Sequence, residues 1–205
     1  MLPNHSSKNE NKWPLEFDHQ STTPCDREVI EAMTPYCQEH WGNPSSRNHR
    51  SGLQAAAAVN HARDELSNLL KIPSERLIFT SGATEANNIA LLGYARAQAK
   101  ILGTPGHLIT LQTEHLAVLD PLRQLQEEGF SITELRPEKT GLLSPKKLKE
   151  ALKQDTILVS VMAANNEIGI IQPLKEISNI CKAKKIMFHS DAAQAFGHIP
   201  IDPNA

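Results

Sequence analysis

The sequence predicts an α/β fold in which helices cover both faces of a mostly parallel sheet. Short β-prone runs alternate with amphipathic stretches at helical spacing. The runs are apolar almost throughout, as is typical of parallel strands that are buried on both faces. The connecting segments are short and no internal repeat is visible. With 205 residues, the chain is long enough for one large domain with a substantial core.

The first half of the chain predicts three helices and one strand. Apolar side chains recur at helical spacing in residues 26–40 and 51–72. Residues 76–80, RLIFT, form a β-prone run that predicts a short strand. The third helix, residues 81–103, is closed by Gly103. The apolar face of the second helix is predicted to contain Leu53, Ala56, Val59, Ala62, Leu66, Leu69 and Leu70.

The second half continues as strand and helix in regular alternation. Ser144 is the predicted N-cap of one helix, and Pro145 stands at its first position. The predicted strands are residues 107–112, 130–135, 156–163 and 186–190, and the predicted helices are residues 114–129, 144–154 and 173–185.

Composition excludes several classes of function. Lys and Arg total 21 against 23 Asp and Glu, a net charge of −2, which gives no electrostatic reason to expect nucleic acid. No apolar run is long enough for a membrane span, and the polar N-terminus lacks a signal-peptide core. We therefore expect a cytoplasmic protein with a disordered tail over residues 1–13. The three cysteines, Cys25, Cys37 and Cys181, show no CxxC spacing, which argues against a disulfide framework or a zinc site.

Polar groups follow four of the predicted strands. Because ligands of parallel sheets bind beyond the carboxyl ends of the strands, these groups are predicted to converge on one site. The four segments are residues 81–85, 113–115, 164–167 and 190–194.

The turn SGAT leads directly into the third predicted helix. The first N–H groups of a helix have no internal partner and lie at the positive end of its dipole, so an anion fits there. The hydroxyls of Ser81 and Thr84 are candidates for further hydrogen bonds to it. The alternative is a capping motif that serves the helix alone.

His115 and Asp191 are the candidate ionisable groups of the site. His115 stands at the head of a helix, where a neutral ring is favoured, and it is predicted either to stack on a flat ligand or move protons, or to be a structural histidine. Asp191 ends an apolar strand, where a carboxylate needs a cation or several donors. A protonated ring nitrogen is one such partner, and the backbone N–H groups of the next turn are the alternative. His189 lies within the strand itself, so we expect it to pack in the core.

Six blocks, in order and spacing, resemble the N-terminal half of the cysteine desulfurases, which are class V, fold-type-I enzymes dependent on pyridoxal 5′-phosphate (PLP). The resemblance begins near Leu15 and implies that residues 14–205 are the N-terminal portion of the PLP-binding large domain. The blocks are FDHQSTTPCDREVIEAM, GNPSSRNHRSG, FTSGATEANNIAL, TEHLAVLDP, NNEIGIIQP and HSDAAQAFGHIPID.

The resemblance assigns a role to each candidate residue. Ala83 and Thr84 match the turn that binds the PLP phosphate, and His115 matches the histidine that stacks over the pyridine ring and takes part in proton transfer. Asp191 matches the carboxylate that pairs with the pyridinium nitrogen and keeps the ring protonated.

Two further matches lie near the phenolic oxygen of the ring, and they are Asn166 and Gln194. The resemblance implies an L-cysteine substrate and removal of its sulfur, with alanine and an enzyme persulfide as products. The persulfide supplies iron–sulfur cluster assembly or other sulfur transfer, so a sulfur-acceptor or scaffold protein and a homodimer are implied as partners.

The chain ends before the block that carries the family's Schiff-base lysine and before its nucleophilic cysteine. We therefore expect residues 1–205 to be inactive on their own. Two alternatives stay open. One is a non-catalytic remnant or interaction module, and the other is a related PLP enzyme such as a selenocysteine lyase.

Overall fold

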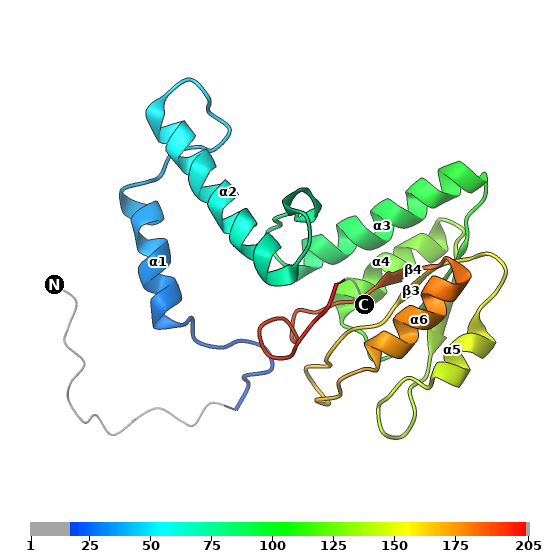
Figure 1. The fold of residues 1–205 in the computed structure, drawn as a ribbon. Coiled ribbons are helices and arrows are strands. Elements are labelled where there is room, and N and C mark those ends of the chain that lie inside the picture. The colour runs from blue at the N-terminus through cyan, green and yellow to red at the C-terminus, as the bar shows by residue number, and fades with distance from the viewer. Residues whose placement is uncertain (1–16, 204–205) are drawn as a thin grey trace. The chain divides into compact units, whose positions relative to one another are not determined.

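The computed structural model describes residues 17–203, so the predicted disordered tail, residues 1–13, lies outside the described residues. The chain divides into two compact units, Met1–Glu39 and His40–Ala205. The first unit contains α1 (Arg27–Gln38). The second contains α2 (Arg50–Leu70), the 3₁₀ turn η1 (Ser74–Arg76), α3 (Ala83–Leu102), β1 (His107–Leu111), α4 (Leu116–Glu127), β2 (Ser131–Leu135), α5 (Pro145–Ala151), β3 (Thr156–Ser160), α6 (Leu174–Lys184) and β4 (Met187–His189) (Figure 1).

The four strands form one parallel sheet in the order β2-β1-β3-β4 (Figure 1). Leu108 pairs with Leu158 and Ile109 with Val159 between the two central strands, β1 and β3. Every residue of β1 and of β3 is buried, as the continuous apolar runs predict. The predicted parallel α/β sheet is confirmed.

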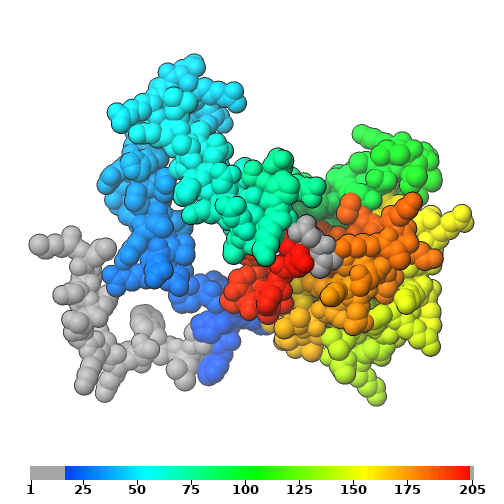
Figure 2. All heavy atoms as spheres, viewed as in Figure 1, coloured from blue at the N-terminus to red at the C-terminus, as the bar shows by residue number. Residues whose placement is uncertain are grey.

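Each face of the sheet packs against its own pair of helices. On one face, Leu108 and Leu158 meet the buried side chains of α3 and α4, including Leu91 and Leu122. On the other face, a second cluster joins the sheet to α5 and α6, and Figure 2 shows α6 in orange. Because successive strand residues point to opposite faces, one apolar run supplies both cores. The members of the second cluster are Ile109, Leu111, Leu143, Leu148, Val159, Val161, Ile177 and Cys181.

The predicted strand at residues 76–80 is wrong. Arg76 ends the 3₁₀ turn, and residues 77–80 run on without pairing to any described strand. Ile78 is 73% exposed, and Phe79 is exposed apart from the Arg63 guanidinium, which lies 4.7 Å from its ring centre. A β-prone sequence becomes a strand only when a neighbouring backbone accepts and donates its hydrogen bonds, and no described strand does so here.

The apolar face of α2 is also largely exposed within the described residues. Leu53 and Leu69 are open to solvent, and the buried positions of this helix are Gly52 and Ala55. Of the three cysteines, Cys181 is buried and Cys25 and Cys37 are exposed, and all three are free. Within residues 17–203 no helix has both the length and the apolar character to cross a membrane, and no cluster of side chains suits a metal ion.

Candidate active site

Asp191 follows β4 and is buried, with 7% of its surface exposed. Its two carboxylate oxygens accept separate hydrogen bonds. The Asn87 side chain donates to Oδ2 at 2.8 Å, and the Ala193 backbone N–H donates to Oδ1 at 2.9 Å. The second bond is the local turn expected as the structural alternative, and it leaves lone pairs on both oxygens. The site therefore holds a buried carboxylate with room for a further donor.

The hydrogen bond from Asn87 links the first turns of α3 to the Asp191 carboxylate. Residues four apart share one face of a helix, so Asn87 lies one turn along the same face as Ala83. The backbone N–H groups of Ala83 and Thr84 have no acceptor among the described residues. Two free N–H groups at the positive end of a helix can bind an anion.

Ser81 does not contribute its hydroxyl to this end of α3 as a free group. The carboxylate of Glu85, in the first turn of α3, accepts from the Ser81 N–H at 2.6 Å and from its hydroxyl at 2.8 Å. These hydrogen bonds lower the pKa of Glu85. Ser81 thus bonds to the first turn of α3, while no side chain caps the helix N–H groups themselves.

His115 is the N-cap of α4. Its Nδ1 accepts a hydrogen bond from the Ala117 N–H at 3.0 Å, which requires a lone pair on Nδ1 and assigns the proton of the neutral ring to Nε2. The ring is exposed, so its faces and Nε2 are available to a ligand. The capping bond thus uses Nδ1 and leaves the other ring atoms open to solvent.

Two neighbouring asparagines after β3 behave differently. Asn165 is buried, and its side chain bonds to Thr113 O at 2.7 Å and to the N–H groups of Glu167 and Ile168. The Asn166 side chain makes no hydrogen bond to the described residues. Asn165 therefore shapes the loop and leaves Asn166 available for a ligand.

His115 and Asn166 line one pocket of about 340 Å³. It lies at the carboxyl ends of β1 and β3, where the fold predicts a ligand site. Glu114 lines it as well. Gln194 is exposed in the turn that follows Asp191, three residues further along the chain.

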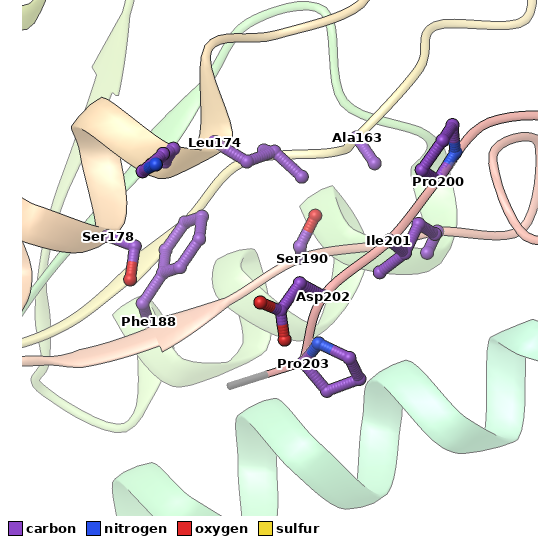
Figure 3. A pocket seen from close by; sticks show the side chains of 11 residues that line it. Ala163, Leu174, Ser178, Phe188, Ser190, Pro200, Ile201, Asp202 and Pro203 are labelled. Carbon is purple, nitrogen blue, oxygen red and sulfur yellow. The ribbon is translucent and has the colours of Figure 1, made fainter. Parts of the chain in front are cut away.

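A larger pocket, of about 760 Å³, lies between α6, β4 and the segment that follows β4. Phe188 and Ser190 face it, while His189 and Asp191 alternate with them along the chain (Figure 3). The C-terminal segment, in red beside α6 in Figure 2, forms its other wall with Asp202. This pocket therefore contacts the α6 side of the sheet, and Asn87 approaches Asp191 from the α3 side.

His189 occupies a partly buried position at the end of β4, where its Nδ1 pairs with the Ser160 hydroxyl at 2.8 Å. Burial lowers the pKa of His189 to about 4, against the charge of Asp191, which raises it. The ring is therefore neutral at pH 7 and serves the sheet, as expected for a histidine within the strand.

The sequence alone assigns no role to two residues of this arrangement, although Glu114 lies in one of the four predicted segments. Asn87 lies 104 residues from Asp191 along the chain, and only the fold brings them together. Glu114 precedes His115 and lies three residues after the end of β1, a position similar to that of Asp191 after β4. It is 6% exposed, and the Met162 N–H donates to its Oε1 at 2.8 Å.

Known proteins share both the sequence and the fold. A cysteine desulfurase IscS of Colwellia psychrerythraea is 48% identical over 95% of this chain and 48% of its own length. The mouse cysteine desulfurase is 48% identical over 98% of this chain and 43% of its own. A structure described as SspA in complex with cysteine superposes with a TM-score of 0.84 at 35% identity, over 90% of this chain and 52% of its own.

The chain thus spans about half the length of the curated relatives it matches. The sequence model of the aminotransferase class-V family matches residues 16–205, nearly the whole chain. The resemblance seen in the six sequence blocks is confirmed, and the chain belongs to the aminotransferase class-V family.

Proposed function

We propose that this chain provides the cofactor-binding part of a cysteine desulfurase that uses PLP. The observation that carries the proposal is the buried Asp191 carboxylate, which Asn87 and Ala193 hold at the carboxyl end of the sheet with lone pairs to spare. Relatives that share this half of the sequence are cysteine desulfurases, and one structural neighbour is described with cysteine bound.

The donors and acceptors of the site fit PLP group by group. The free N–H groups of Ala83 and Thr84 suit a phosphate, since they lie at the N-terminus of α3. The Asp191 carboxylate suits a protonated ring nitrogen, because its burial makes an opposite charge favourable. His115 presents an exposed ring face, as stacking requires.

Asn166 and Gln194 are proposed to bind the phenolic oxygen of the ring. Asn166 lines the pocket beside His115 and its amide makes no bond within the described residues. PLP, when bound, supplies an electron sink for the amino acid substrate. Within this arrangement Asp191 keeps the ring nitrogen protonated, and His115 offers Nε2 as the atom that gives or receives a proton.

The substrate of the whole protein is proposed to be L-cysteine, whose sulfur passes to an enzyme persulfide and then to an acceptor or scaffold protein. A homodimer and a cytoplasmic location belong to the same proposal. A selenocysteine lyase is the second candidate, since the residues named here bind the cofactor and few of them choose the substrate. Turnover of cysteine against selenocysteine by the complete protein separates the two.

The experiment that tests cofactor binding uses pyridoxamine 5′-phosphate, which has the ring and phosphate of PLP but forms no Schiff base with surface lysines. Its dissociation constant for residues 1–205 is measured by fluorescence titration. We expect Asp191→Ala to weaken binding at least tenfold, whereas Asp120→Asn, on the exposed side of α4, leaves it within twofold. Equal affinities for the wild type and Asp191→Ala would overturn the proposal.

A further inference from the structure

Glu114 is the second buried carboxyl group at the carboxyl ends of the strands. It follows β1, and 94% of its surface is withdrawn from solvent. Its Oε1 accepts the Met162 N–H at 2.8 Å, whereas its Oε2 is buried and has no hydrogen-bond partner in the described part of the chain. Burying a charged oxygen without a donor costs free energy, so the ionised form of Glu114 is disfavoured.

The Glu114 side chain and the Asp191 backbone accept hydrogen bonds from consecutive residues of one segment. Met162 donates its N–H to Glu114, and the next residue, Ala163, donates its N–H to the backbone oxygen of Asp191 at 2.8 Å. Burial disfavours a charge on Glu114, and the negative charge of Asp191 disfavours it further. One of the two is therefore expected to hold a proton.

The carboxyl groups of Asp191 and Glu114 differ in the hydrogen bonds that they accept. Asp191 receives a donor on each oxygen, which stabilises its charged form. Glu114 receives one donor in total, and its other oxygen receives none. Of the two carboxyl groups, Asp191 therefore has the more complete set of hydrogen bonds to its oxygens.

We propose that Glu114 is a positioning residue of the cofactor site, a neutral carboxylic acid that fastens the end of β1 to the segment after β3 and leaves Asp191 as the charged member of the pair. The cofactor part of this statement rests on the function proposed above. Because His115 is the next residue, fixing Glu114 also fixes the start of α4 and the ring that lines the pocket.

Electrostatics around Glu114 agree with this assignment. Burial raises the pKa of Glu114 to about 8, the Met162 hydrogen bond lowers it, and the charge of Asp191 raises it. The titratable groups around it are Asp191, which follows β4, His115 at the N-cap of α4, and Glu167 on the loop after β3.

The direct test is a ¹³C NMR titration of the Glu114 carboxyl carbon in the whole chain labelled with ¹³C-glutamate. The signal is assigned by through-bond correlation to the Glu114 backbone, so the assignment needs no variant. We expect the protonated chemical shift at pH 6 and titration near pH 8, with exposed Glu127 in the same spectra as the reference. The ionised shift at pH 6 would overturn the proposal, whether or not the chain binds the cofactor.

A second measurement separates positioning from a general contribution to stability. The dissociation constant of pyridoxamine 5′-phosphate is compared at pH 7 and pH 9. We expect the wild type and the control Glu127→Gln to bind at least threefold more weakly at pH 9, because ionised Glu114 then adds a second buried anion. Glu114→Gln removes that group and should cut the change to less than 1.5-fold. The same pH response in Glu114→Gln and the wild type would contradict the positioning role.

Discussion

Two apolar regions of the second unit differ sharply in what surrounds them. The central strands and the helices on them are buried, and Leu122 on α4 is 1% exposed. From α2 to Thr80 the sequence is similarly apolar, yet Leu69 is 70% exposed and residues 77–80 pair with no described strand. The difference shows that an apolar pattern states what a segment can bury, while a partner surface decides whether it does.

The largest expected effect comes from making the same substitution in both regions. Leu122→Ala removes side-chain atoms that pack between α4 and the sheet, and it should lower the free energy of unfolding by about 2–5 kcal/mol. Leu69→Ala, on the exposed face of α2, should change it by less than about 0.5 kcal/mol. Urea unfolding of both variants makes the comparison, and similar losses would show that α2 is buried in solution.

Amide hydrogen exchange sharpens the contrast between the two β-prone segments. The backbone N–H groups of β3 donate within a buried sheet, whereas those of Ile78, Phe79 and Thr80 have no acceptor among the described residues. We expect residues 78–80 to exchange at least about 100-fold faster than residues 157–160. Mass spectrometry of peptides from each segment measures the rates. Equal protection would mean that residues 78–80 pair with another strand in solution.

The segments that the sequence predicts correctly as strands are the ones that have a partner strand in the fold. Residues 107–112 and 156–163 were predicted as strands and contain β1 and β3, because their apolar runs match burial on both faces. Residues 76–80 are also β-prone, but they form no strand. Pairing depends on a neighbouring strand, which is a property of the fold and not of the segment. The position of Asp191 after a strand was predictable, but its donor Asn87 comes from a helix 104 residues earlier.

A smaller effect should come from His189, which joins the edge strand β4 to β3 through Ser160. Its pKa is about 4 in the folded chain against 6.5 for a free histidine, so the folded chain binds fewer protons between these values. Stability from this group is complete above pH 6.5 and is lost as pH falls toward 4, by on the order of 1–3 kcal/mol.

Urea unfolding of the wild type and His189→Gln between pH 4 and pH 7 measures this contribution. The difference in unfolding free energy between the two should shrink as pH falls. A constant difference over this range would show that His189 has the same affinity for protons in the folded and unfolded chain.

In the proposed site, the buried Asp191 carboxylate holds a ring nitrogen in its protonated form. The measurement that tests it most directly is the ¹⁵N NMR shift of the ring nitrogen in pyridoxamine 5′-phosphate, labelled at that atom and bound to residues 1–205. We predict a pyridinium shift that persists at least about one pH unit above the pKa of the free ligand and disappears in Asp191→Ala. A neutral-pyridine shift in the bound wild type would contradict the assignment of Asp191.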